Sequence, residues 1–180
     1  GASTKKTQID YRLYPSTTIA EFGLVDEVRV YGSDLSTVLK KQETDYNLSS
    51  TYLDRRIIGL PSKTQTYGWN DITQTLELAS ELTYAFDGED FSLEANQVIS
   101  PIRHDTANFG SSFVAGRGNL TSVTRHDVTS QTAAVTTKTR YDIAGSVVAR
   151  LDPLNRKVRF EYTDVFNDTT NYGKNLGCSF

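Results

Sequence analysis

The chain has 180 residues, 37% of them hydrophobic and 23% charged, and a formal net charge of −3 at pH 7. This length suits one domain, or at most two small ones, with a core of usable size. Acidic and basic residues are interspersed rather than gathered in a basic stripe, and no apolar run approaches the ~20 residues of a membrane span. We therefore expect no nucleic-acid partner and no membrane insertion.

The single cysteine and the first residues carry limited information. Cys178 cannot form an internal disulfide, although a disulfide between two chains stays open. The sequence contains no methionine and begins with Gly1-Ala2-Ser3, without a signal peptide. These features suggest a processed end or a piece of a longer protein.

Four pairs of segments have the pattern expected for the two limbs of a β-hairpin. They are rich in Thr, Val, Tyr and Phe, which fit a pleated, half-buried surface. In the segment around Val28 and Val30, apolar and polar residues alternate, which is the period of a strand with one buried face. The outward limbs span residues 23–31, 59–67, 118–126 and 145–152, and the return limbs span residues 35–46, 76–87, 133–142 and 158–162.

One of these segments also fits a helix. Asp71 could cap it, and four apolar residues follow within residues 71–84. Its threonine content and its place in the hairpin order favour a strand instead. The connection at residues 108–118, which holds three glycines, is expected to be a long loop.

Hairpins that follow one another predict an all-β fold of consecutive antiparallel strands. We expect about five imperfect hairpins in a single domain over residues 1–166, followed by an irregular tail at residues 167–180. A flat sheet of about ten strands would twist and curl, and its edges need cover. The prediction is therefore a curved open sheet or a partial barrel, in which a free edge makes a homodimer possible.

The clearest hairpin lies within residues 140–164. Asp152 suits the first position of a type I turn, where its carboxylate can accept hydrogen bonds from the backbone, and Pro153 suits the second. Asn155 tolerates left-handed backbone geometry. Beyond the turn, Val158, Phe160 and Tyr162 occupy every second position, as in a strand.

This hairpin resembles the YD repeat of Rhs proteins, teneurins and insecticidal-toxin shells. The resemblance covers about one repeat, with Asn155 in place of the usual glycine, and upstream copies are degenerate. The resemblance implies an extracellular or cell-surface setting, in a bacterium. Too few repeats are present to close the hollow shell of the longer relatives, and their self-cleavage motifs are missing. The matching residues are Tyr141, Asp142, Gly145, Asp152, Pro153, Arg156 and Tyr162.

Carboxylates are the candidates for catalysis. Glycoside hydrolysis needs two of them ~5–10 Å apart, and Glu81 and Asp87 are the acids that would serve, with a partner on the next limb. Glu77 and Glu81 alone would be about 13 Å apart along a strand. A solvated sheet face carries such charges routinely, so we favour a structural role. The sequence has no serine-nucleophile elbow and no phosphate-binding glycine loop, and we predict no cofactor.

Two histidines invite a zinc hypothesis, since each is followed by an aspartate. However, His104 and His126 both stand between Arg and Asp, as Tyr141 does, so the repeat explains them without a metal. The acidic turn at residues 87–90 lacks the alternating ligand spacing of a calcium loop. We therefore predict no metal site.

Aromatic residues give the stronger binding signal. Tyr67 and Trp69, the only tryptophan, flank a glycine at a predicted hairpin tip. Such rings can stack on a sugar or contact a protein partner. Alternatively, Trp69 folds back to cover the open end of the sheet.

The leading hypothesis is thus a non-catalytic structural or interaction module of a secreted or cell-surface YD-repeat protein. Its ligand would be a glycan, a partner chain or a second copy of itself. The alternative is a carbohydrate-active hydrolase with paired carboxylates on a concave sheet.

Overall fold

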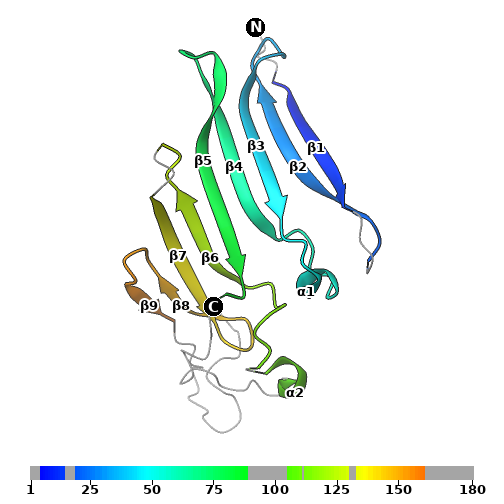
Figure 1. Cartoon of the computed structure of the whole chain (residues 1–180), viewed down its shortest axis with the longest axis vertical. Coiled ribbons are helices and arrows are strands. Elements are labelled where there is room, and N and C mark those ends of the chain that lie inside the picture. The colour runs from blue at the N-terminus through cyan, green and yellow to red at the C-terminus, as the bar shows by residue number, and fades with distance from the viewer. Residues whose placement is uncertain (1–4, 15–18, 89–104, 111, 130–132, 161–180) are drawn as a thin grey trace. The chain divides into compact units, whose positions relative to one another are not determined.

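The computed structural model describes residues 5–14, 19–88, 105–110, 112–129 and 133–160. Within these ranges the chain forms nine strands and two helices of four residues each (Figure 1). The elements are β1 (Thr7–Tyr14), β2 (Phe22–Tyr31), β3 (Val38–Tyr46), α1 (Ser50–Leu53), β4 (Pro61–Asn70), β5 (Thr75–Phe86), α2 (Thr106–Phe109), β6 (Leu120–His126), β7 (Ala134–Tyr141), β8 (Val147–Leu151) and β9 (Lys157–Arg159).

The nine strands form one open sheet in the order β1 to β9, so each strand lies beside its neighbours in the sequence. The β1–β5 ladders and the β7–β9 ladders are antiparallel. The predicted all-β fold of consecutive hairpins is therefore confirmed. Each predicted limb overlaps one of the strands β2 to β9, and residues 75–86 form a strand, so the helical alternative for that segment is wrong.

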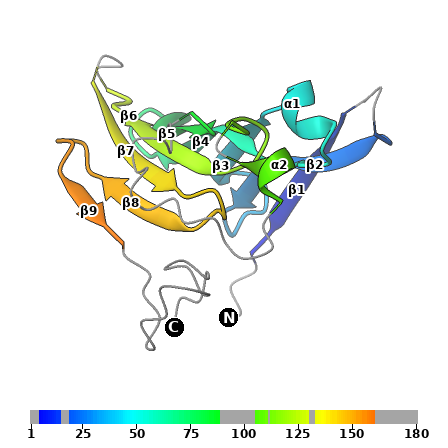
Figure 2. The same cartoon turned by 90° about the horizontal axis from the view of Figure 1, so that it is seen from below.

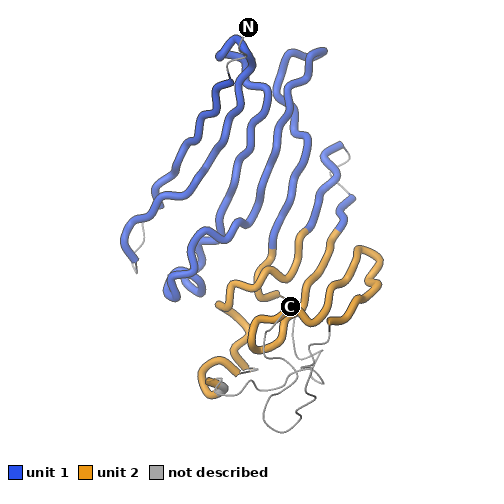
Figure 3. Tube along the Cα trace, turned by 180° about the vertical axis from the view of Figure 1, so that it is seen from behind, with its two compact units in different colours: residues 1–84, 124–135 blue, residues 85–123, 136–180 orange. Residues whose placement is uncertain are grey.

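Backbone contacts divide the chain into two compact units (Figure 3). Unit 1 comprises residues 1–84 and 124–135, and unit 2 comprises residues 85–123 and 136–180. Unit 1 holds β1 to β4 and most of β5, and unit 2 holds β8, β9 and most of β7.

The core of unit 1 is a small aromatic cluster. The buried ring of Tyr14 stacks on Phe22, with centroids 5.8 Å apart, and meets Tyr46 edge-on at 6.2 Å. The Tyr46 hydroxyl donates a hydrogen bond of 2.8 Å to the carbonyl oxygen of Val25, and burial raises the pKa of Tyr46. Tyr52 of α1 is the other buried hydrophobic residue in the described part of this unit.

The core of unit 2 forms around the end of β7, where β7, β8 and β9 lie side by side (Figures 1 and 2). Its buried hydrophobic residues, within the described ranges, are Ile143, Val148 and Ala149. The Tyr141 hydroxyl donates to the carbonyl oxygen of Leu120 at 3.0 Å, and burial raises the pKa of Tyr141.

The turn prediction for β8 and β9 is confirmed in detail. The Asn155 N–H donates to the carbonyl oxygen of Asp152 at 2.9 Å, and Asn155 has a φ of 58°. Oδ1 of Asp152 accepts hydrogen bonds from the N–H groups of Leu154 and Arg156. The Asp152 side chain therefore satisfies two backbone donors of the turn.

Helices contribute little to this structure. A four-residue helix is only about 6 Å long, whereas a ten-residue strand such as β4 extends over about 33 Å. Neither described helix can therefore cover a sheet face along its length. No helix of the described residues is long and apolar enough to cross a membrane.

Candidate interaction surface

Cross-strand register places charged side chains in two neighbouring rows on one face of β1–β5, which we call the polar face. In such rows, side chains directly opposite each other have Cβ atoms roughly 4.5–5.5 Å apart. The carboxylate row holds Asp10, Glu27, Glu43, Gln65 and Glu81, and the basic row holds Gln8, Arg29, Lys41 and Tyr67.

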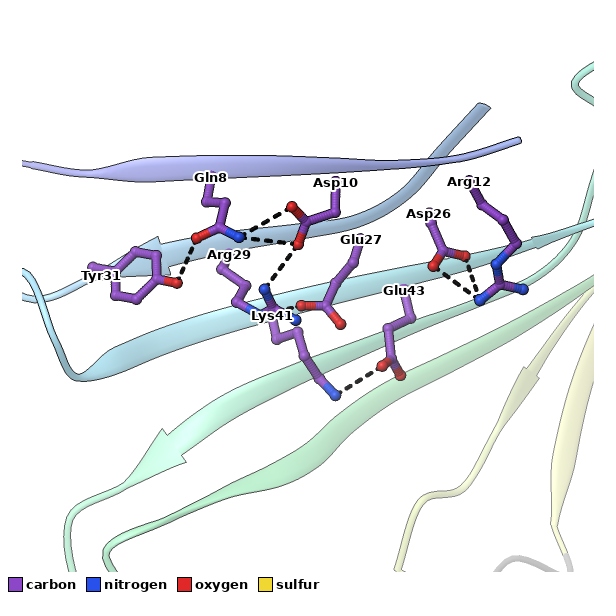
Figure 4. Close-up of polar contacts among 9 residues, drawn as sticks. All are labelled: Gln8, Asp10, Arg12, Asp26, Glu27, Arg29, Tyr31, Lys41 and Glu43. Atoms are coloured by element: carbon purple, nitrogen blue, oxygen red, sulfur yellow. Dashed lines mark hydrogen bonds and ion pairs between the residues drawn. The ribbon is translucent and has the colours of Figure 1, made fainter. Parts of the chain in front are cut away.

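Salt bridges connect the two rows (Figure 4). Arg29 reaches Asp10 at 2.8 Å and also pairs with Glu27. Lys41 binds Glu43 at 2.8 Å. These cations offset the repulsion between carboxylates that stand directly opposite one another, which would otherwise destabilise the pairing.

Neutral side chains extend the same network. Gln8 donates to Asp10 and accepts a 2.9 Å hydrogen bond from the Tyr31 hydroxyl. Its amide thus connects a carboxylate of β1 with a phenol of β2. The polar face is therefore a bonded network, and the hydrogen bond from Lys41 lowers the pKa of Glu43.

The opposite face of β1 and β2 is apolar. Ile9 pairs with Val28, and Tyr11 pairs with Val25. Leu13 lies over Gly23, 3.6 Å from the position that a Cβ atom would take there. We define the apolar patch as Ile9, Tyr11, Leu13, Val25, Val28 and Val30.

This patch is most exposed along β1. Ile9, Tyr11 and Leu13 are 49%, 66% and 62% exposed, whereas the three valines of β2 are half-buried. β1 is also the first strand of the sheet, so in the described part of the chain its outer edge pairs with no strand. Apolar side chains and free backbone groups therefore coincide on β1, which is the usual composition of a docking site.

Tyr67 and Trp69, the aromatic residues proposed for binding, lie in the strand that leads into a hairpin turn. Both lie within β4 and are half-buried, and the turn itself consists of residues 71–74. The ammonium group of Lys41 lies 4.2 Å from the centre of the Tyr67 ring. Tyr67 thus makes a cation–π contact within the protein.

The acids proposed for catalysis take part in structural contacts. Glu81 accepts a 2.6 Å hydrogen bond from the Gln65 amide. Asp87 accepts hydrogen bonds from the N–H groups of Arg117, Gly118 and Asn119, at 2.9–3.0 Å. The two acids belong to different units. Hydrogen bonds to its neighbours Asn70 and Thr73 lower the pKa of Glu77.

Arg117 is the centre of the loop that Asp87 caps. Its guanidinium donates to the carbonyl oxygens of Phe113 at 2.6 Å, Ile143 at 2.7 Å, Phe109 at 2.6 Å and Gly110 at 3.0 Å. Burial lowers its pKa, against the attraction of Asp87 and Asp142. This arginine connects the α2 loop to the turn that follows β7, a role that the sequence pattern did not indicate.

The residues of the YD-like motif occupy turns in unit 2. Asp142 is 2% exposed, and its Oδ1 accepts hydrogen bonds from the N–H groups of Ala144 and Ser146. Gly145 has a φ of 86°, a conformation that favours glycine. Asp152 and Arg156 form an ion pair, and Pro153 lies in the turn between them. Tyr162 lies outside the described residues.

No metal centre is assembled within the described ranges, where no three His, Cys, Asp or Glu side chains come together. His126 pairs instead with the Thr83 hydroxyl at 3.0 Å. His104, Glu89, Asp90 and Cys178 lie outside the described residues.

A comparison of the sequence with protein-family models finds no match, and a comparison with curated proteins finds none either.

Proposed function

We propose that this chain is a non-catalytic interaction module that binds a protein surface through β1 and the apolar patch. The resemblance to YD repeats supports a setting in a secreted or cell-surface protein. The observation that carries the proposal is the exposure of apolar side chains. Among the described residues, thirteen large hydrophobic side chains are exposed and only five hydrophobic residues are buried. A sheet of this kind reaches its full stability when another surface covers it.

The contacts of the acids support a structural role rather than hydrolysis. A general acid of a glycosidase needs a raised pKa, whereas hydrogen bonds from Asn70 and Thr73 lower the pKa of Glu77. Asp87 uses both carboxylate oxygens to hold a loop.

The test measures whether the apolar patch is accessible in the folded chain. The probe 8-anilinonaphthalene-1-sulfonate should bind and fluoresce at neutral pH. The double substitution Val28→Thr/Val30→Thr should reduce that fluorescence several-fold while the far-UV circular dichroism stays unchanged. Val135→Thr, at an exposed valine of β7, is the matched control and should leave dye binding unchanged.

A panel of chromogenic glycosides tests the rival function. Turnover that disappears in Glu81→Gln would overturn the proposal, as would a folded chain that binds no dye.

A further inference from the structure

The edge strand β1 carries a sequence that is complementary to itself. The sequence around Tyr11 is Ile9, Asp10, Tyr11, Arg12, Leu13. An acid and then an apolar residue precede Tyr11, and a base and then an apolar residue follow it. We propose that two copies of this chain associate by antiparallel pairing of their β1 strands, about a two-fold axis that passes Tyr11. The inference rests on the proposed function and names a second copy of the chain as the partner.

The backbone of β1 is oriented for this pairing. The Tyr31 N–H donates to the carbonyl oxygen of Lys6 at 3.0 Å, so even-numbered residues of β1 direct their hydrogen-bonding groups toward β2. The odd-numbered residues Ile9, Tyr11 and Leu13 therefore direct theirs toward the free edge. The bulge in this ladder places its extra residue, Asp26, on β2, so β1 keeps its alternation throughout.

The register about Tyr11 joins the free groups of the two copies. Tyr11 pairs with Tyr11 of the second copy, and Ile9 pairs with Leu13. These are the residues whose N–H and C=O groups face outward, so each pair can exchange two backbone hydrogen bonds. A register shifted by one residue would place the apolar side chains of one copy beside the polar side chains of the other.

Side-chain chemistry favours the same register. On the polar face, Asp10 of each copy stands opposite Arg12 of the other, and opposite charges in such cross-strand pairs are stabilising. These side chains remain 42% and 55% exposed beside their partners Arg29 and Asp26, so each can accept a second contact. On the apolar face, pairing joins the two apolar patches edge to edge.

The other edge of the sheet lacks this complementarity. β9 consists of Lys157, Val158 and Arg159. A two-fold axis at Val158 would place Lys157 opposite Arg159 of the second copy, so like charges would meet. Burial and the charge of Arg159 already lower the pKa of Lys157. Self-association through β1 is therefore favoured over self-association through β9.

Sedimentation velocity on the full chain, with reductant present, measures the association. An interface of one strand edge is small, so we expect a dissociation constant on the order of 10 µM. In a homodimer of Asp10→Lys, each introduced lysine faces Arg12 of the other copy. In a homodimer of Arg12→Glu, each introduced glutamate faces Asp10 of the other copy. Each substitution alone should therefore weaken the homodimer at least tenfold. An equimolar mixture of the two variants should restore the dimer, because the introduced lysine then faces the introduced glutamate, and the native Arg12 faces the native Asp10.

The mixture distinguishes the interface from a folding defect, since a misfolded variant cannot be rescued by its counterpart. A chain that stays monomeric up to about 500 µM, far above that expected dissociation constant, would overturn the inference. So would a dimer whose dissociation constant is unchanged by both single substitutions, or a mixture that does not recover. If neither variant folds, Tyr11→Cys in a Cys178→Ser background should form an interchain disulfide on oxidation, whereas Thr73→Cys should not. Dye binding that persists in a monomer would leave the proposed function standing with a different partner.

Discussion

Arg117 offers the sharpest test of how unit 2 is held together. Arg117→Ala removes donors to the carbonyl oxygens of Phe109, Gly110, Phe113 and Ile143. Water can replace the exposed bond to Phe109, but three part-buried carbonyls lose a charged donor. At roughly 1 kcal/mol for each part-buried bond, the free energy of unfolding should fall by about 3 kcal/mol. That is a large fraction of the roughly 5–15 kcal/mol that stabilises a typical domain.

The assay combines urea unfolding, followed by far-UV circular dichroism, with amide hydrogen exchange. Exchange should accelerate in residues 105–119 and 141–146, which the guanidinium connects, and remain slow in β2 and β3 of unit 1. Arg117→Lys keeps the charge, but its compact ammonium group lacks the rigid guanidinium fork that reaches four carbonyls, so it should lose most of the same stability. Arg125→Ala, at an exposed arginine of β6, is the surface control and should change stability by less than about 0.5 kcal/mol. A change of that small size for Arg117→Ala would refute the role we assign to it.

Three further predictions concern the turns and the polar face. Gly145→Ala should lower the free energy of urea unfolding by about 1 kcal/mol, because its φ is positive and no atom lies within 4 Å of the added Cβ. A loss above about 3 kcal/mol would mean that the substitution displaces neighbouring atoms. Asp87→Ala should destabilise unit 2 by about 2 kcal/mol in the same assay. Asp87→Asn should cost less, because its amide oxygen still accepts hydrogen bonds from the loop N–H groups. Equal losses for the two variants would contradict the capping role. The lowered pKa of Glu43 predicts stability that is present above about pH 4.5 and is lost as the pH falls through the folded-state pKa. Lys41→Met should reduce this pH dependence by at most about 1 kcal/mol, measured from urea unfolding at pH 7 and pH 3. An unchanged pH dependence of stability in Lys41→Met would contradict the pairing.

Local turn chemistry made much of this fold predictable. Asp152, Pro153 and Asn155 each have a conformational preference that acts within a few residues, and the structure places them as those preferences require. The limbs that overlap β2 to β9 could be predicted for a similar reason, since alternation and flanking turn residues are both local signals.

β1 is the strand that the repeated hairpin pattern does not predict, although its own sequence alternates. Ile9, Tyr11 and Leu13 alternate with polar residues, as a strand with one apolar face requires. No glycine stands at its start, as it does in the outward limbs, so β1 does not fit the repeated hairpin pattern. The candidate site lies on this first strand of the sheet, so the internal repeats alone do not predict it.

The rows of the polar face could not be predicted from alternation alone, because register depends on bulges. Five of the six described ladders contain a register shift, and each shift falls immediately before a tyrosine: Tyr11, Tyr31, Tyr46, Tyr67 or Tyr141. In each case the tyrosine lies on the regular strand and the extra residue lies on the strand that follows.

Each such shift changes which side chains stand opposite one another beyond it, so the pairing of Asp10 with Glu27 cannot be extended past Tyr11 by counting. The tyrosines then make contacts across the sheet: Tyr31 with Gln8, Tyr46 with the Val25 carbonyl and Tyr141 with the Leu120 carbonyl. Each of these five tyrosines therefore marks the place where the following strand carries an extra residue and the cross-strand register shifts. Since β1 itself carries no extra residue, its edge keeps the regular spacing that pairing with a second copy requires.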